Sequence, residues 1–204
     1  MITIDEIIER DFLKEIRTFD FKDDEDWDSS IEKNNLTIPS VVSECNRNYM
    51  LKYFRMIESC KSILEIGVND YPGCLSRVLI DNKKDETKYL GVDINPIPFT
   101  DVSKNQFGIQ TDSADYEIIM SFAESKNISN FDFIFIDGWH SVNQILKEWR
   151  FIEHLNPNGI VAIHDTNYHA GAKKLIENLN HDKFIIEKYC AGLDDYGIAF
   201  VRRK

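Results

Sequence analysis

The sequence is poor in basic residues relative to acidic ones. Its 204 residues include 24 Lys and Arg against 35 Asp and Glu, which gives a formal net charge of −11. A surface of this sign repels nucleic acid and anionic membranes. No run of basic residues is longer than the C-terminal Arg202-Arg203-Lys204. We therefore expect no nucleic-acid partner and no membrane partner, and we interpret the charge mainly as a contribution to solubility.

Closely spaced cysteines and long apolar runs are also lacking. The four cysteines form no Cys-x-x-Cys pair, so they predict reduced, intracellular thiols: Cys45, Cys60, Cys74 and Cys190. No apolar run approaches the roughly 18 residues of a membrane span. The acidic N-terminus lacks the basic-then-apolar pattern of a signal peptide. These features predict a cytoplasmic protein.

Residues 1–60 differ in pattern from residues 61–204, and we expect them to form an N-terminal helical extension. A Ser/Thr-x-x-Glu capping box at Thr3 precedes apolar residues at helical spacing. The acidic stretch 20–28 favours a solvated loop, with a lid over the active site as the alternative. A second helix is predicted to begin at Pro39.

From residue 61 onward, short apolar runs alternate with amphipathic segments. The expected strands are 62–67, 88–93, 131–137 and 159–165. The expected helices are roughly 73–82, 113–126, 141–155 and 170–180. Nearly continuous apolar strands separated by helices predict an α/β fold with a parallel sheet covered on both faces. Two further strands, 184–189 and 197–201, are joined by a short loop, which favours an antiparallel pair.

Polar residues follow the strands at the edge where an open parallel sheet binds its ligands. Any one of them could simply end a strand or cap a helix, but five successive strand ends favour a functional rim. The rim residues are Glu65 and Gly67, then Asp93, Asp112, Asp137, and the pair His164-Asp165.

The turn after the first strand does not match a dinucleotide fingerprint. Gly67 is followed by Val-Asn-Asp, so the second glycine of Gly-x-Gly-x-x-Gly is missing and Asp70 would repel phosphate. A cationic ligand without phosphates suits this turn better. S-adenosylmethionine is such a ligand, because its sulfonium and ammonium groups favour nearby oxygens. Asp93 is the candidate that would accept the ribose hydroxyls.

Several segments together resemble the class I S-adenosylmethionine-dependent methyltransferases. Within that class they are most similar to the family-24-type branch, which is related to the catechol and macrocin O-methyltransferases. The resemblance covers about residues 61–203 and is carried by 63–67 (ILEIG), 90–94 (LGVDI), 111–114 (TDSA), 131–141 (FDFIFIDGWHS), 155–165 (LNPNGIVAIHD) and 196–203 (YGIAFVRR).

The resemblance implies a Rossmann-like three-layer fold with a seven-stranded, mostly parallel sheet and an antiparallel last strand. It implies a cofactor site formed by the rim and its neighbours: Glu65, Gly67, Asn69, Asp93, Ile94, Asp112, Ser113 and Asp137. One departure is Asn69, which stands where the family has a further glycine.

A metal site is also implied by the resemblance. In metal-dependent relatives, an aspartate after the fourth strand and an Asp-Asn pair after the fifth hold the ion. The matching residues here are Asp137, Asp165 and Thr166, with threonine in place of asparagine. The ion would be Mg²⁺ or a transition metal.

Three histidines lie near the same edge: His140, His164 and His169. One of them could be a general base, since imidazole titrates near neutral pH, and we assign catalysis to His140, His164 and Asp137. Alternatively, two could be metal ligands, which would favour a transition metal over Mg²⁺. The structural alternative is that His140 caps a helix and that His164 is a hydrogen-bonded rim residue.

The expected function is O-methylation of a small molecule, such as a sugar or a secondary metabolite. Trp139 and Tyr168 would sandwich this acceptor or, equally, pack over the sheet edge. Three alternatives stay open: a nicotinamide-dependent oxidoreductase, a ligand-binding protein of this fold without turnover, and a metal-dependent hydroxylase-like relative. The oligomeric state is also open, with a homodimer as one option.

Overall fold

The computed structural model describes residue 49 and residues 60–70, 74–167, 169–190 and 195–204. The expected N-terminal helices and the acidic stretch 20–28 lie outside these residues, as does Tyr168. The proposed domain boundary near residue 60 therefore stays a prediction.

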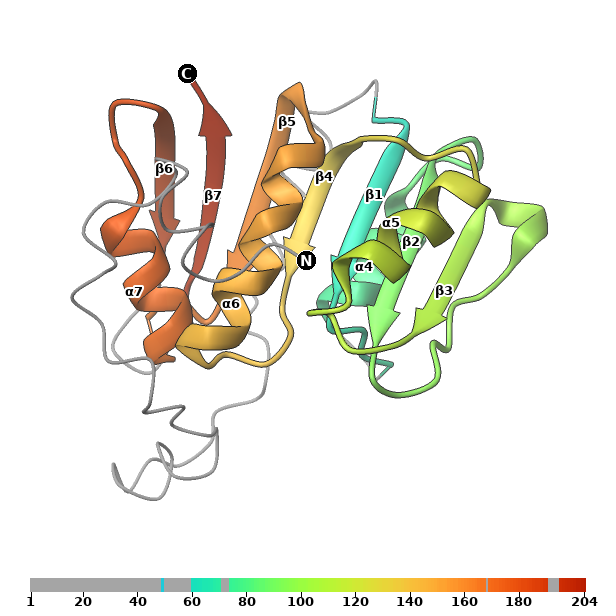
Figure 1. The fold of residues 1–204 in the computed structure, drawn as a ribbon, viewed down its shortest axis with the longest axis horizontal. Helices are drawn as coiled ribbons and strands as arrows, with labels where there is room; N and C mark the ends of the chain where they lie inside the picture. The colour runs from blue at the N-terminus through green and yellow to red at the C-terminus, as the bar shows by residue number, and fades with distance from the viewer. Residues whose placement is uncertain (1–48, 50–59, 71–73, 168, 191–194) are drawn as a thin grey trace.

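Seven strands form one sheet in the order β3-β2-β1-β4-β5-β7-β6 (Figure 1). Neighbouring strands from β3 to β5 pair in parallel, and β7 pairs antiparallel with both β5 and β6. The expected fold class, including the antiparallel last strand, is confirmed. The strands are β1 (Ser62–Ile66), β2 (Lys88–Asp93), β3 (Gln106–Gln110), β4 (Phe131–Ile136), β5 (Leu155–His164), β6 (Phe184–Tyr189) and β7 (Ile198–Arg203).

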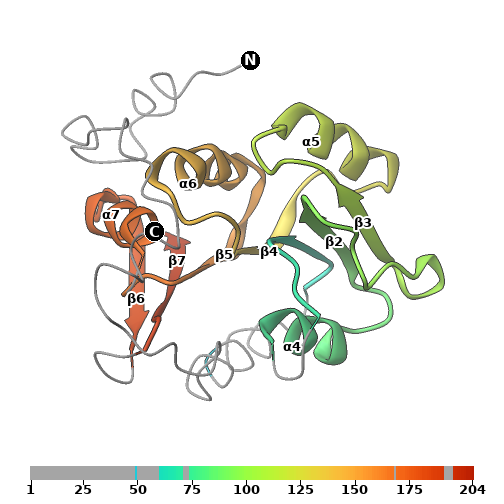
Figure 2. The same ribbon diagram turned by 90° about the horizontal axis from the view of Figure 1, so that it is seen from below.

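Helices cover both faces of the sheet, as Figure 2 shows. One face carries α5 (Tyr116–Ser125), α6 (Val142–Trp149) and α7 (Ala170–Asn178), which pack into one large apolar cluster with the strands. The other face carries α4 (Leu75–Asn82), which packs into a second apolar cluster, and Tyr49 packs against this second cluster. Two 3₁₀ helices, η2 (Val102–Lys104) and η3 (Arg150–His154), complete the elements of the described residues.

The strands β1, β2 and β4 are buried on both faces, which explains their nearly continuous apolar sequences. All five residues of β1 are buried, and only the end residues of β2 are half-exposed. Two boundaries differ from expectation. The helix expected at 141–155 ends at Trp149 and continues as η3. β5 begins at Leu155, because this residue pairs with Phe131; the register then shifts, and regular pairing runs from Ile160 onward.

The strand order places a topological switch between β1 and β4. Chain connections leave these neighbours in opposite directions, so their carboxyl ends leave a crevice that ligands use in open α/β sheets. Within the described residues, no helix has the length and apolar character that a membrane crossing needs. The described cysteines Cys60, Cys74 and Cys190 are free thiols.

Candidate functional site

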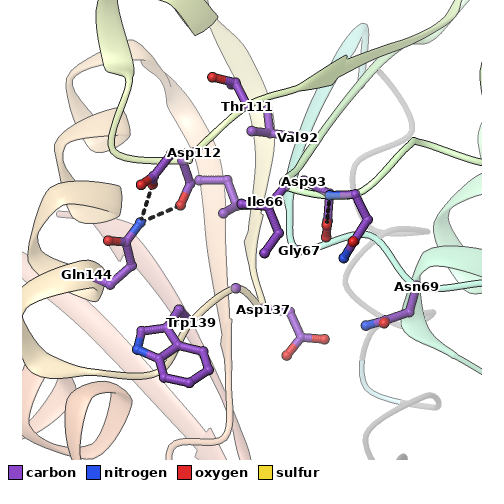
Figure 3. Close-up of a pocket in the computed structure, with 14 residues that line it drawn as sticks. Ile66, Gly67, Asn69, Val92, Asp93, Thr111, Asp112, Asp137, Trp139 and Gln144 are labelled. Atoms are coloured by element: carbon purple, nitrogen blue, oxygen red, sulfur yellow. Dashed lines mark hydrogen bonds between the residues drawn. The ribbon is translucent and has the colours of Figure 1, made fainter. Parts of the chain in front are cut away.

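A cavity of about 420 Å³ opens over this switch point (Figure 3). Its size is within the range of small-molecule sites. Residues that follow β1, β2, β3 and β4 line it, together with Gln144 of α6. The structure brings together all the predicted cofactor residues except Glu65: Gly67, Asn69, Asp93, Ile94, Asp112, Ser113 and Asp137.

Gly67 allows the end of β1 to pass close to the end of β4. Its φ is +83°, and a Cβ at this position would lie 2.0 Å from the carbonyl oxygen of Asp137. The amide of Gly67 also donates to the carbonyl of Val92 at 2.9 Å. A side chain here would meet both backbone strain and overlap, so the crevice requires glycine.

Asp93 is held at the cavity by backbone amides. One carboxylate oxygen accepts a hydrogen bond from the amide of Val68 at 2.9 Å, and the other accepts from the amide of Asn95 at 2.7 Å. The carboxylate is therefore fixed between the turn after β1 and the turn after β2. Ile94 beside it is 70% exposed, which leaves an apolar side chain at the cavity.

Two residues of α6 that the sequence analysis missed support the third turn. The Nε2 of Gln144 donates to Asp112 at 3.0 Å and to the hydroxyl of Ser113 at 2.7 Å. Ser113 in turn donates to Glu148 at 2.6 Å. Glu148 is fully buried, and burial raises its pKa to about 7 against the opposing effect of the Ser113 bond. The i, i+4 spacing of Gln144 and Glu148 on an amphipathic helix was the available signal.

Glu65 lies beneath the turn after β1, away from the cavity lining. It is 0% exposed and accepts hydrogen bonds from Ser76, at 2.6 Å, and from the hydroxyl of Tyr89. Burial raises the pKa of Glu65 to about 8, although these two bonds oppose the shift. The hydroxyl of Ser76 also accepts from the amide of Asn69 at 3.0 Å. Glu65 thus supports the turn through Ser76, and its direct contact with a cofactor stays a prediction.

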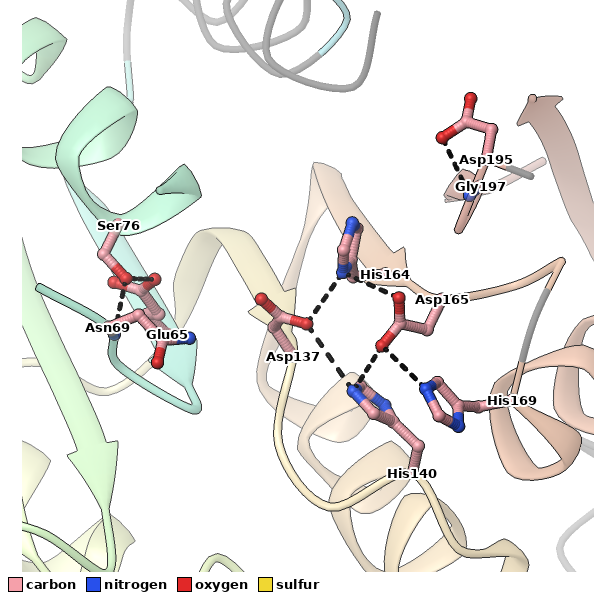
Figure 4. A network of polar contacts seen from close by, with 10 residues as sticks. All are labelled: Glu65, Asn69, Ser76, Asp137, His140, His164, Asp165, His169, Asp195 and Gly197. Carbon is pink, nitrogen blue, oxygen red and sulfur yellow. Dashed lines mark hydrogen bonds and ion pairs between the residues drawn. The ribbon is translucent and has the colours of Figure 1, made fainter. Parts of the chain in front are cut away.

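A second group of polar residues lies beside the cavity, after β4 and β5 (Figure 4). We call Asp137, His140, His164, Asp165 and His169 the His-Asp cluster. The Nδ1 of His164 lies 2.9 Å from Oδ1 of Asp137 and 3.1 Å from Oδ1 of Asp165. The Nε2 of His140 lies 2.6 Å from Oδ2 of Asp165 and 3.7 Å from Oδ1 of Asp137. Both predicted catalytic histidines therefore converge on the same two carboxylates.

The third histidine packs behind this group at the start of α7. The ring of His169 stacks on that of His140, with centroids 4.8 Å apart and planes 16° apart. Its Nε2 lies 3.7 Å from Oδ2 of Asp165. Asp165 itself is 2% exposed and has a φ of +61°, an uncommon conformation for a residue other than glycine.

Burial and the carboxylates act against each other on these imidazoles. Burial lowers the pKa values of His164 and His140, but Asp165 and Asp137 outweigh it and raise both above the usual value. For Asp165, burial is outweighed by His164 and His140, which hold its pKa below the usual range. Burial dominates at His169 and lowers its pKa to about 4. The two carboxylates therefore act in the same direction on the pKa values of His140 and His164, whereas burial dominates at His169.

Three members of the cluster have the spacing of metal ligands. One atom each of Asp137, His164 and Asp165 lie within 4.8 Å of one another. Thr166, the third ligand that the resemblance implied, is buried. Its Oγ1 packs close to Gly197, 3.1 Å from the position that a Cβ atom would have there. Metal binding by Thr166 therefore stays a prediction, while His164 occupies the position between the two aspartates.

Trp139 is an aromatic residue at the cavity. It lines the cavity, is 50% exposed, and follows Asp137 by two residues (Figure 3). Its indole ring is therefore available to a flat ligand surface.

No protein-family model and no protein of curated function matches this sequence. Solved structures match in fold. The MycE methyltransferase of the mycinamycin biosynthetic pathway, in a complex with Mg, S-adenosylhomocysteine and mycinamycin VI, superposes with a TM-score of 0.58 and 19% identity. The match covers 86% of this chain and 53% of MycE, so the chain spans about half the length of that protein.

Two shorter proteins match over most of both chains. An O-methyltransferase from Bacillus cereus, in complex with S-adenosylhomocysteine, has a TM-score of 0.57 and 14% identity, and the match covers 87% of this chain and 88% of that one. TomG, an O-methyltransferase from Streptomyces achromogenes in complex with S-adenosylmethionine, has a TM-score of 0.55 and 13% identity, with 86% of each chain covered. At these identities the likeness shows a shared Rossmann-like fold.

Proposed function

We propose that the protein is an S-adenosylmethionine-dependent methyltransferase that methylates an oxygen atom of a small molecule. The observation that carries the proposal is the position of Asp137, which lines the cavity and also belongs to the His-Asp cluster. A methyl donor in the cavity and an acceptor oxygen at the cluster would therefore lie next to each other. The similar structures that contain S-adenosylmethionine or its demethylated product support this assignment.

The cavity suits the methyl donor better than a dinucleotide. Asp93, Asp112 and Asp137 line it, so its charge is unfavourable for a pyrophosphate and favourable for a sulfonium. We assign the ribose hydroxyls to Asp93, whose carboxylate is already fixed by two backbone amides. The Asp112-Gln144 pair would contact the adenine side, and the exposed Ile94 would cover the ring.

The His-Asp cluster suits an acceptor hydroxyl and a cation. Methyl transfer needs mainly alignment of the acceptor and removal of its proton. His140 or, in the absence of a bound ion, His164 would take this proton, because both lie beside Asp137, which lines the cavity. A divalent ion, when bound, would stabilise the acceptor as an alkoxide. The residues fit such an ion, since Oδ1 of Asp165 is buried and accepts no hydrogen bond.

Several finer properties belong to the same proposal. Acceptor specificity is assigned to residues 1–60 and to the loops after β4 and β5. A small-molecule acceptor is favoured by the complex of MycE with mycinamycin VI. The excess of acidic residues disfavours nucleic-acid and membrane partners, and the scattered cysteines favour a cytoplasmic protein.

Calorimetry with S-adenosylmethionine and S-adenosylhomocysteine tests the proposal. Asp93→Ala removes a charged acceptor, which is worth about 1.5–3 kcal/mol, so the Kd should rise roughly 10- to 150-fold. Asp182→Ala, at an exposed residue, is the control and should leave the Kd unchanged. Absence of binding to the unaltered protein would remove the methyltransferase assignment, and an unchanged Kd in Asp93→Ala would show that the ribose binds elsewhere.

A transfer assay with labelled S-adenosylmethionine and a panel of hydroxylated acceptors separates the alternatives. Labelled product is expected for at least one acceptor. Retained binding without transfer would favour a ligand-binding protein. Binding of a nicotinamide nucleotide, followed by fluorescence, would favour an oxidoreductase.

A further inference from the structure

We propose that Asp137, His164 and Asp165 form a site for a divalent first-row transition metal, with His164 as the ligand that makes the site favour such an ion over Mg²⁺. This deepens the proposed function, on which its catalytic meaning rests, but binding of the ion is measurable without any methyl donor.

The three side chains place one possible ligand atom each within 4.8 Å of one another. Two ligands that each lie about 2.1 Å from an ion, at right angles to each other, are about 3.0 Å apart. The Nδ1 of His164 lies 2.9 Å and 3.1 Å from the nearest oxygens of Asp137 and Asp165. These separations suit an ion of the size of Mg²⁺, Mn²⁺, Co²⁺ or Zn²⁺, so size alone does not select among them.

A second observation distinguishes this group from an ordinary ion-pair network. Asp165 is 2% exposed, and its Oδ1 accepts no hydrogen bond although it faces His164. A buried carboxylate oxygen without a donor is costly. The other oxygen of Asp165 already lies 2.6 Å from His140. Oδ1 is thus the atom of this carboxylate that remains for a cation.

The kind of ligand decides the kind of ion. Mg²⁺ is a hard cation that takes oxygen ligands and keeps several waters, whereas imidazole suits Zn²⁺, Fe²⁺, Co²⁺ and Ni²⁺. Two carboxylates and one imidazole on adjoining strand ends leave further coordination positions toward the cavity, because Asp137 lines it. An acceptor oxygen from the cavity side could occupy such a position.

The arrangement around His164 supports its role as a ligand. It ends β5, is 4% exposed, and its ring lies edge-on to Phe135 of β4. The strand and the aromatic neighbour hold the ring, so that Nδ1 points toward both aspartates (Figure 4). A metal ligand fixed in this way loses little conformational freedom on binding.

The test uses the full-length, untagged protein after treatment with a chelator. Co²⁺ is titrated alone and followed by its visible d–d absorption, and Mg²⁺ is then added as a competitor. Co²⁺ should bind at one site per chain, and Mg²⁺ should displace it only at an excess of about 100-fold or more. His164→Asp, which converts the site to oxygen ligands, should lower the ratio of Co²⁺ to Mg²⁺ affinity at least about tenfold.

Two further variants keep the result interpretable. His181→Ala changes an exposed histidine outside the site and should leave the Co²⁺ titration unchanged. Asp165→Asn should weaken both Co²⁺ and Mg²⁺, because it removes a shared oxygen ligand, and circular dichroism checks the fold of each variant. An affinity ratio unchanged in folded His164→Asp, or Mg²⁺ binding as tight as Co²⁺ in the unaltered protein, would overturn the proposal. A bound ion without S-adenosylmethionine binding would instead count against the proposed function alone.

Discussion

Replacing Glu65 with glutamine should change how the stability of the protein depends on pH. Glu65 is completely buried between Ser76 and Tyr89, and burial raises its pKa from 4.5 to about 8. Between pH 4.5 and about pH 8, Glu65 is protonated in the folded state but ionised in the unfolded state. The free energy of unfolding therefore falls as the pH rises through this window, and below the lower value Glu65 makes no such contribution.

The size of the effect follows from the shift. Each pH unit in which only the unfolded state has released the proton lowers the free energy of unfolding by about 1.4 kcal/mol. From pH 5 to pH 7.5 the total for Glu65 is about 3 kcal/mol, because the folded state begins to titrate near the upper end. Glutamine has the shape of the protonated acid, and its amide can donate to Tyr89, so Glu65→Gln should remove this slope without leaving a cavity.

Urea denaturation at several pH values between 5 and 7.5 measures the effect. Relative to the unaltered protein, Glu65→Gln should gain about 3 kcal/mol of stability across this range. Other titrating groups contribute equally to both proteins and cancel in the difference. Glu124→Gln, on the exposed face of α5, is the matched control and should show no such gain. Parallel stability curves for Glu65→Gln and the unaltered protein would refute the reasoning, since they would mean that the buried carboxyl ionises normally.

Two other substitutions test the walls of the cavity. Gly67→Ala should destabilise the protein by roughly 2–5 kcal/mol, because alanine is strained at a φ of +83° and its Cβ overlaps the carbonyl oxygen of Asp137; a loss below about 0.5 kcal/mol in urea denaturation would contradict this. Gln144→Ala removes the hydrogen bonds to Asp112 and Ser113, worth about 0.5–1.5 kcal/mol, so the Kd for S-adenosylhomocysteine should rise roughly 2- to 12-fold in calorimetry. An unchanged Kd would place the adenine away from this pair.

The strands β1, β2 and β4 were predictable because burial on both faces leaves nearly unbroken apolar sequences, whereas β3, with glutamine at both ends, was not among the expected strands. The runs at 62–67, 88–93 and 131–137 correspond to β1, β2 and β4 within one residue. The boundaries of β5 and of the helix before it were less accurate. Leu155 pairs with Phe131, which is distant in the sequence. This pairing extends β5 through the polar residues 156–159, whose sequence (NPNG) is locally typical of a turn.

The part of the site that consists of residues directly after the strands was predictable. Residues that succeed parallel strands meet at one edge, so the acidic rim could be assembled from the sequence. The orientation of Glu65 could not. Leu64 and Ile66 face the cluster under α5, α6 and α7, and the alternation of the strand turns Glu65 toward α4. Gln144 and Glu148 were missed because their partners lie more than 30 residues away.

The sharing of Asp137 has a thermodynamic consequence. A ligand bound in the cavity and an ion bound at the cluster would both act on this one carboxylate, so occupancy of one site would change the free energy of binding at the other. Such linkage is reciprocal. If the bound ion changes the affinity for S-adenosylmethionine by some factor, bound S-adenosylmethionine must change the affinity for the ion by the same factor. The two titrations, each repeated with the other component at saturation, must therefore close a single thermodynamic cycle.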